Sequence, residues 1–243
     1  MEIIQALRLI SIILSVMLSI CYLYQFIYLF VPFFLKRKAH KDASQHRYAV
    51  LVAARNEENV LPYLLDSIEA QDYPKELVDV YVVADNCTDK TAECAAQHGA
   101  SVYQRFNKVQ VGKGYALNYL LGRMKEDGKL DTYDAFLVFD ADNLLSPNYI
   151  TEMNKTCSDG FEAFCGYRNS KNYADNWISA GYALWFLHDS VHLNQSRMLV
   201  GTTCAVSGTG FGFTRKTLES CGGWNFFTLT EDIEFDTWCA THG

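Results

Sequence analysis

The sequence predicts an α/β protein in which a mostly parallel sheet carries helices on both faces and follows one transmembrane helix. Two observations lead to this prediction. Residues 9–35 carry no charge over 27 positions, and after them short apolar runs alternate at least four times with amphipathic stretches. Strands buried on both faces are continuous apolar runs, and alternation of strand with helix is typical of a parallel sheet.

Residues 1–35 are expected to form the N-terminal transmembrane helix. A bilayer core needs about 20 apolar helical residues. A cleaved signal peptide would have a shorter apolar core and a small-residue cleavage site, which the sequence lacks. Residues 36–47 are expected to form a basic juxtamembrane linker. It contains Lys36, Arg37, Lys38 and Lys41, whereas only Arg8 and Glu2 precede the uncharged stretch. The positive-inside rule therefore predicts a protein of the cell membrane, partnered by the lipid bilayer, whose large C-terminal part faces the cytosol.

Composition narrows the class of partner. Six of the 21 basic residues and two of the 28 acidic ones precede residue 48, so the remainder carries a net charge of about −11. This charge disfavours nucleic acid as a partner. The eight cysteines include no CxxC pair, and they are expected to be reduced, mostly structural thiols.

Residues 48–243 are expected to fold as one domain. Strands are predicted at 48–53, 78–84, 101–104 and 135–140, separated by helices at 58–71, 88–98 and 112–125. A helix after Ser146-Pro147, a strand from 163, an aromatic-rich helix at 175–195, a strand at 206–213 and a helix from Thr230 follow. Because ligands of an open parallel sheet bind at the carboxyl ends of its strands, the site is expected there.

Three predicted strands end in loops with charged side chains. These loops are 55–58, 85–89 and 140–142. Asp and Asn also end strands and cap helices for structural reasons alone, so each loop by itself has a second explanation. Asp140 and Asp142 leave the most apolar strand together, and such a pair can hold Mg²⁺ or Mn²⁺ while substrate phosphates complete the coordination. A solvated turn is the alternative for this pair.

Other motifs are less specific. The first strand is followed by AARNEE and not by a glycine-rich loop, which disfavours a dinucleotide-binding dehydrogenase. Gly112-Lys113-Gly114 opens a helix, where backbone amides and Lys113 can meet a phosphate, although simple loop chemistry also explains it. Thr230-Glu231-Asp232 opens the last helix, and capping alone would explain these residues.

The aromatic-rich helix is expected to be a packing element. Core packing is the commoner fate of such side chains, with stacking on sugar rings or a position at the membrane surface as alternatives. The residues concerned are Trp177, Tyr182, Trp185 and Phe186. His188 and His192 are spaced like a metal pair, but no third ligand accompanies them, so a structural role is expected.

Taken in order, these segments resemble glycosyltransferase family 2, especially its membrane-embedded branch of cellulose, chitin and hyaluronan synthases. The segments that carry the resemblance are AARNEE, ADNCTDKT, VGKGYALN, FDADN, SGTGFGFTR and LTEDIEFD, which together span nearly all of residues 48–240. The resemblance implies a GT-A fold, the fold of nucleotide-diphospho-sugar transferases. It also implies inverting transfer of a sugar from a nucleotide-sugar donor, expected to be a UDP-sugar, to a hydroxyl of a glycan or lipid-linked acceptor.

The resemblance also assigns roles to residues of this chain. Asp232 would be the catalytic base. The donor would bind at Ala53, Arg55, Glu57, Asp85, Lys113 and Asp140, and Mg²⁺ or Mn²⁺ would bind at Asp140 and Asp142. The acceptor side would be formed by Gly208, Thr209, Gly210, Phe211 and Glu231.

One departure from the family pattern leaves alternatives open. Synthase-type members carry a QxxRW motif after the last helix, and no such motif is present here, so the domain at 48–243 is expected to be incomplete at its C-terminal side. One alternative is a non-catalytic or incomplete membrane-bound module that binds a nucleotide-sugar. The other is a sugar-nucleotide pyrophosphorylase, which AARNEE disfavours because such an enzyme would open with a glycine-rich phosphate loop.

Overall fold

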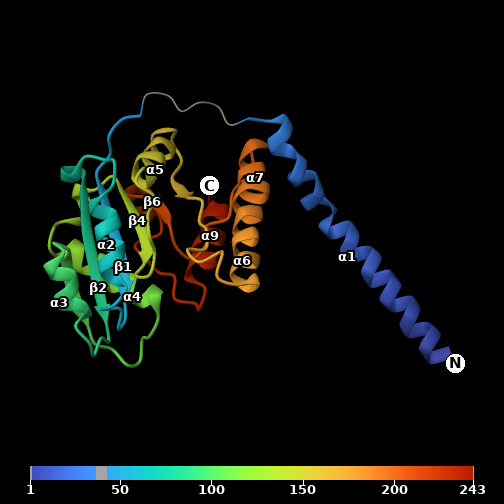
Figure 1. The fold of residues 1–243 in the computed structure, drawn as a ribbon, viewed down its shortest axis with the longest axis horizontal. Helices are drawn as coiled ribbons and strands as arrows, with labels where there is room; N and C mark the ends of the chain where they lie inside the picture. The colour runs from blue at the N-terminus through green and yellow to red at the C-terminus, as the bar shows by residue number, and fades with distance from the viewer. Residues whose placement is uncertain (1, 37–42, 243) are drawn as a thin grey trace. The chain divides into compact units, whose positions relative to one another are not determined.

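The computed structural model describes residues 2–36 and 43–242, which divide into two compact units. The larger unit holds residues 43–166 and 205–242, and the smaller one holds the N-terminal helix and residues 167–204. Figure 1 shows the elements of both units.

Within the described residues, the larger unit is built on a six-stranded sheet of order β3-β2-β1-β4-β6-β5 (Figure 1). Its strands are β1 (Tyr48–Ala54), β2 (Val78–Asp85), β3 (Ser101–Arg105), β4 (Ala135–Asp140), β5 (Ala163–Cys165) and β6 (Phe211–Thr214). Strands β1 to β4 pair in parallel, whereas β6 runs antiparallel to both β4 and β5. The prediction of a mostly parallel sheet is confirmed.

Helices cover both faces of the sheet, as predicted. On one face, α2 (Leu61–Glu69), α3 (Thr91–Gln97) and α5 (Tyr149–Ser158) pack on Tyr48, Val50 and Val52 of β1. On the other face, α4 (Lys113–Glu126), α8 (Arg215–Ser220) and α9 (Glu231–His242) pack on the cluster that contains Ala49 and Leu51. Successive side chains of a strand point to opposite faces, so the apolar run in β1 supplies both cores. Short 3-10 turns at Lys75–Leu77 (η1) and Leu130–Thr132 (η2) precede β2 and β4.

The strand predicted at 206–213 is shorter than expected. It begins only at Phe211, because Gly208 and Gly210 adopt left-handed backbone conformations, with φ of 53° and 66°. A strand cannot continue through such residues. The segment 206–210 is therefore a loop at the end of β4, beside the acidic strand ends.

The smaller unit is helical. It contains α1 (Glu2–Phe34) and one uninterrupted run made of α6 (Trp177–Leu187), the π-helix η3 (His188–Asn194) and α7 (Gln195–Leu199). Among the described residues, α1 alone is long and apolar enough to cross a bilayer, with a mean hydropathy of 2.2 over its span. This agrees with the predicted helix at 1–35. Of the predicted basic linker 36–47, residues 37–42 lie outside the described residues.

The expectation that the aromatic side chains of α6 pack in a core is wrong for three of them. Trp177 is 84% exposed, Tyr182 59% and Trp185 61%. Phe186 is half-buried, and the Arg168 guanidinium lies 4.8 Å from the centre of its ring. The helix begins two residues later than predicted because Asn176 caps it, accepting hydrogen bonds from the backbone N–H groups of Ile178 and Ser179.

Candidate active site

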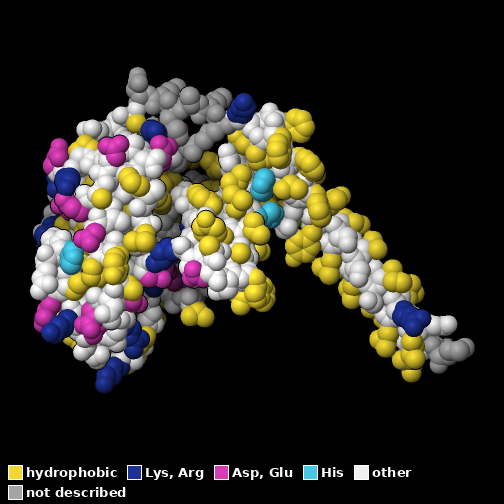
Figure 2. All heavy atoms as spheres, in the orientation of Figure 1, with side chains coloured by type: hydrophobic (Ala, Val, Ile, Leu, Met, Phe, Trp, Pro, Cys, Tyr) yellow, Lys and Arg dark blue, Asp and Glu magenta, His cyan; other side chains and the backbone are white. Residues whose placement is uncertain are grey.

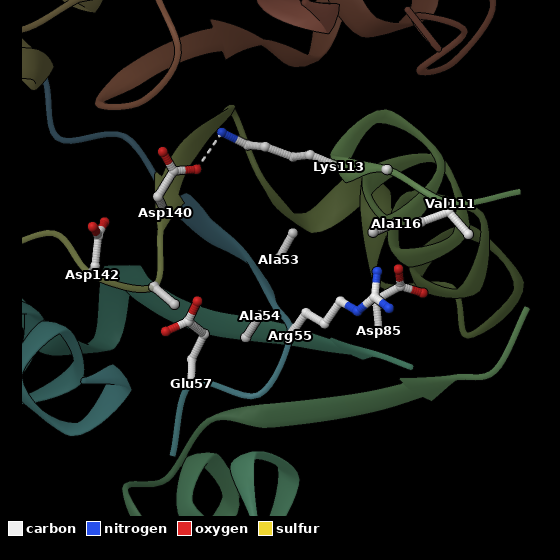
Figure 3. Close-up of a pocket in the computed structure, with 12 residues that line it drawn as sticks. Ala53, Ala54, Arg55, Glu57, Asp85, Val111, Lys113, Ala116, Asp140 and Asp142 are labelled. Atoms are coloured by element: carbon white, nitrogen blue, oxygen red, sulfur yellow. Dashed lines mark hydrogen bonds and ion pairs between the residues drawn. The ribbon is translucent and has the colours of Figure 1, made fainter. Parts of the chain in front are cut away.

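A cavity of about 380 Å³ opens where β1, β2 and β4 end (Figure 3). It is lined by Ala53, Ala54, Arg55, Glu57, Asp85, Val111, Gly112, Lys113, Ala116, Asp140, Ala141 and Asp142. All seven residues that the sequence predicted for donor or metal binding are in this lining. The geometry of the sheet explains the convergence, because Ala53 of β1 pairs with Asp140 of β4 and with Val83 of β2, so the three loops leave the sheet at one edge.

Lys113 joins three parts of the site. Its ammonium donates to Asp140 Oδ1 at 2.6 Å and to the Gly208 carbonyl at 2.5 Å, and it lies 3.8 Å from Glu231 Oε1. Figure 3 shows the Lys113 side chain reaching across the cavity to Asp140. The first turn of α4, the end of β4, the loop before β6 and the start of α9 are thus held by one cation.

The cavity carries an excess of negative charge. Burial raises the pKa of the Glu57 carboxyl above its ordinary value, and the neighbouring carboxylates of Asp142, Asp89 and Asp140 raise it further. Figure 3 shows Asp140 and Asp142 on the same side of the cavity, with Glu57 below them. Carboxylates that disfavour one another's ionisation attract a cation.

The donor set fits a hard divalent ion. Asp140 and Asp142 offer carboxylate oxygens, the ligands that Mg²⁺ and Mn²⁺ prefer, one residue apart at the mouth of the cavity. In the described part of the chain, no group of three or more His, Cys, Asp or Glu side chains is arranged to hold a metal by itself. Phosphate oxygens of a substrate and water would therefore have to complete the coordination, as is usual for Mg²⁺.

Asp85 is held by a buried ion pair that sequence reasoning did not single out. Arg105 Nη1 lies 2.6 Å from Asp85 Oδ1, and the two side chains are 5% and 8% exposed. Arg105 Nη2 also donates to the Gln110 carbonyl at 2.7 Å. The two residues are register partners at the ends of β3 and β2. The sequence shows a basic residue directly after the strand predicted at 101–104, but the strand order is needed to place it beside Asp85.

Two asparagines hold the loops that carry the acids, and sequence reasoning missed them as well. Asn56 and Asn86 adopt φ of 58° and 53°, a left-handed conformation that Asn tolerates better than most residues. The Asn56 side chain accepts a hydrogen bond from Thr88 N at 2.8 Å, and that of Asn86 accepts one from Asn107 N at 2.9 Å. Asn86 directly follows β2 and Asn56 lies two residues after the end of β1, and at both positions this conformation turns the chain away from the sheet.

The segment expected on the acceptor side lies against Asp140. Thr209 Oγ1 accepts a hydrogen bond from Asp140 N at 2.8 Å and donates one to Asn143. The Gly210 carbonyl accepts from the Tyr149 hydroxyl at 2.7 Å. Phe211 is fully buried, and its ring packs on those of Trp224 and Phe235. Gly208 and Thr209 thus border the site, whereas Phe211 supports the segment from the core.

The first residues of α9 lie beside this segment. Asp232 Oδ2 accepts a hydrogen bond from Gly208 N at 2.5 Å, which orients its carboxylate. Glu231 is buried, and burial raises the pKa of its carboxyl, with Asp232 and Asp140 adding to the rise and Lys113 opposing it. Asp232 is half-buried and does not line the cavity itself. It is linked to the cavity through Gly208, whose carbonyl binds Lys113.

The sheet order, its antiparallel β6 and the acid-lined cavity define the class as a GT-A fold. Similar solved structures agree. The mannosyltransferase PcManGT from Pyrobaculum calidifontis, solved with GDP-Man and Mn²⁺, aligns with a TM-score of 0.61 and 20% identity over 91% of this chain and 61% of its own. TarS of S. aureus (residues 1–349) aligns with a TM-score of 0.53 and 16% identity over 80% and 55%. At these identities the likeness shows the fold alone.

Residues 46–243 match the family described as "Glycosyltransferase like family 2", and the chain belongs to this family of transferases. Similar sequences include a beta-monoglucosyldiacylglycerol synthase of Nostoc sp., 29% identical over 76% of this chain and 39% of that protein. The probable glycosyltransferase YdaM of Bacillus subtilis is 25% identical over 77% and 45%. The chain thus spans less than half the length of these relatives. The predicted family is confirmed, whereas the synthase branch stays a prediction.

Proposed function

We propose that the chain carries the donor site and the catalytic acids of a membrane-anchored glycosyltransferase that moves a sugar from a nucleoside-diphospho-sugar to a hydroxyl of a lipid acceptor. One observation carries this proposal: seven side chains from four separate segments of the sequence converge on one cavity at the carboxyl edge of the sheet. The similarity to a beta-monoglucosyldiacylglycerol synthase supports a lipid acceptor. A glycan acceptor is the alternative.

The charge of the donor explains the composition of the cavity. A diphosphate would be repelled by Glu57, Asp140 and Asp142 unless a cation stood between them. Asp140 and Asp142 would hold Mg²⁺ or Mn²⁺, which when bound would neutralise the departing diphosphate. The Mn²⁺ of the GDP-Man complex of the mannosyltransferase supports this choice. Lys113 would add a second positive charge at the same edge and would have to share Asp140 with the metal.

The nucleobase would lie at Asp85. A carboxylate accepts hydrogen bonds and donates none, so it favours a base that presents a ring N–H, as uracil and guanine do, over adenine or cytosine. The Arg105 ion pair holds the Asp85 carboxylate in one orientation at the cavity wall. Solved TarS with bound UDP supports a uridine donor. A UDP-sugar is therefore the donor that we propose, with Ala53, Arg55 and Glu57 along the same wall.

Asp232 would act as the general base of an inverting displacement. The acceptor oxygen would form a bond to the anomeric carbon, its proton would pass to the Asp232 carboxylate, and the bond from the anomeric carbon to the diphosphate oxygen would break. The Gly208 N–H holds Oδ2 of Asp232 and so fixes the direction of its carboxylate. Glu231, Gly208, Thr209 and Gly210 would shape the acceptor side, where small residues permit a close approach to the backbone.

The anchor would keep this chemistry at the bilayer. The uncharged span of α1, whose most apolar part is not buried by other described residues, supports a membrane-spanning role, and the basic residues after it support a cytosolic position of the larger unit. A nucleotide-sugar is made available in the cytosol and a lipid hydroxyl at the bilayer surface. Anchoring would hold the donor site of the larger unit close to the lipid acceptor.

The test is sugar transfer by Asp232→Asn in the complete protein, reconstituted in vesicles that contain diacylglycerol lipids and assayed with UDP- and GDP-sugars. We expect a loss of transfer of about 10²-fold or more, the usual contribution of a general base, with donor binding retained. Asp236→Asn is the matched control, because Asp236 lies one turn later in α9 and its carboxylate accepts from Val206 N. Transfer that survives Asp232→Asn would remove Asp232 as the base. Donor binding without any transfer by the unaltered protein would favour the non-catalytic alternative.

A further inference from the structure

Helix α6 presents an apolar surface that the described residues leave uncovered. No charged residue occurs between Trp177 and Leu187, and Ser179 is the one residue of the helix that the described chain buries. Its exposed large side chains are Trp177, Ile178, Tyr182, Leu184, Trp185 and Leu187. A helix that is apolar all round is normally covered by protein or by lipid.

We propose that α6 lies in the interfacial layer of the lipid bilayer, beside the end of the membrane-spanning helix. This inference rests on the proposed anchoring by α1. The headgroups and the upper part of the acyl chains would cover the apolar surface of α6. Trp and Tyr prefer this layer because one part of each ring system is apolar and another part forms hydrogen bonds.

The packing of the smaller unit joins the helix run that begins with α6 to the membrane-spanning helix. The helix run continues from α6 through η3 into α7, and both η3 and α7 contact α1. Ser196 of α7 is fully buried, and its hydroxyl donates to the Tyr28 carbonyl of α1 at 2.7 Å. Tyr28 lies six residues before Phe34, where α1 ends, and so about 9 Å along the helix axis from that end. If α1 spans the bilayer, α7 packs on its last turns, at the boundary of the hydrocarbon.

The length and the ends of α6 favour the interface over a second crossing. The helix run continues into η3, but its apolar part ends at Leu187 and has 11 residues, about half as many as a spanning helix requires. Polar Asn176 caps its start, and His188 and Asp189 follow its end. Arg168 lies over the ring of Phe186, from where a guanidinium can reach lipid phosphates while its stem stays on apolar surface. In Figure 2 hydrophobic side chains cover much of α1 and part of α6 on the visible face.

The tryptophans provide the test. The chain has four, of which Trp177 and Trp185 lie on α6, whereas Trp224 is buried and Trp238 is half-buried in the larger unit. The complete chain is reconstituted in phosphatidylcholine vesicles whose acyl chains carry bromine, a quencher of tryptophan emission, either near the headgroup or near the chain end. The matched variant is Trp177→Phe/Trp185→Phe, which keeps α6 apolar and leaves the two reference tryptophans in place.

We expect shallow bromine to quench the unaltered protein by up to about half of its emission, since two of four tryptophans face lipid. We expect bromine near the chain end to quench the unaltered protein less. In the variant, shallow bromine should quench a fraction of the emission that is at least about twofold smaller. Equal quenching of both proteins would overturn the inference and would show that another part of the protein or a second copy covers α6. Stronger quenching by deep bromine would overturn it in favour of a crossing helix. Flotation of the vesicles tests anchoring by α1 separately from the position of α6. A protein that does not float with the vesicles refutes anchoring by α1 itself.

Discussion

Gly114, the second residue of α4, is a position where the structure predicts a large effect of a single methyl group. A Cβ at this position would lie 2.0 Å from the Phe226 carbonyl oxygen and 3.3 Å from Phe227 Cα, and both are backbone atoms. Gly114→Ala must therefore move the segment 226–227 away from α4. Overpacking costs about 1–3 kcal/mol, and a backbone neighbour, which cannot rotate away, places the loss near the upper end of that range.

Gly122→Ala in the same helix is the matched control. Nothing lies within 4 Å of a Cβ at Gly122, so the methyl group gains helix propensity of about 0.5–1 kcal/mol without a clash. The assay is urea unfolding of the complete chain in detergent micelles, followed by tryptophan emission. We expect Gly114→Ala to lower the unfolding midpoint and Gly122→Ala to raise it. Because Lys113 directly precedes Gly114, the affinity for the donor should fall in Gly114→Ala and stay unchanged in Gly122→Ala. Equal midpoints would refute the close approach of α4 to the segment before α9.

Two further predictions concern buried charges. Arg105→Met should lower the free energy of unfolding by about 3–5 kcal/mol, because it leaves a buried carboxylate without its partner, and Asp85→Asn in the same chain should restore part of the loss in urea unfolding. Burial raises the pKa of Glu231, so the folded protein holds this proton to higher pH than the unfolded chain does, and stability is lost as pH rises above about 4.5. In Glu231→Gln the free energy of unfolding should fall less between pH 4.5 and 8 than in the unaltered protein, as measured by urea unfolding at each pH. Glu93→Gln, at an exposed position, should leave this fall unchanged. The same fall in both variants would contradict the assignment to Glu231.

The parallel part of the fold could be predicted because its strands are continuous apolar runs, as strands covered on both faces must be. The convergence of Asp85, Asp140 and Lys113 followed from topology alone, since parallel strands end at one edge. The antiparallel entry of β6 could not be predicted in the same way. The pattern of apolar residues predicts a strand here but not its direction, and Gly208 and Gly210, with left-handed backbone, shorten it to Phe211–Thr214.

The contacts that individual side chains make were the least predictable part of the structure. Arg105 is one of many basic residues in the sequence, and only strand register places it beside Asp85. The exposure of Trp185 and Tyr182 was mispredicted because apolar periodicity does not tell whether protein or lipid covers a helix. Phe211 lies in a glycine-rich motif that borders the site, yet alternation along β6 turns its ring into the core.

The central claim is that the cavity at the carboxyl edge of the sheet binds a nucleoside-diphospho-sugar through a divalent cation held by Asp140 and Asp142. Calorimetric titration of the purified chain with a UDP-sugar tests it most directly. We predict binding in Mg²⁺ or Mn²⁺ that weakens at least about tenfold, or 1.4 kcal/mol, on chelation, and a similar loss of affinity for Asp142→Asn in the presence of metal. Equal affinity with and without the cation, or an unaffected Asp142→Asn protein, would contradict it.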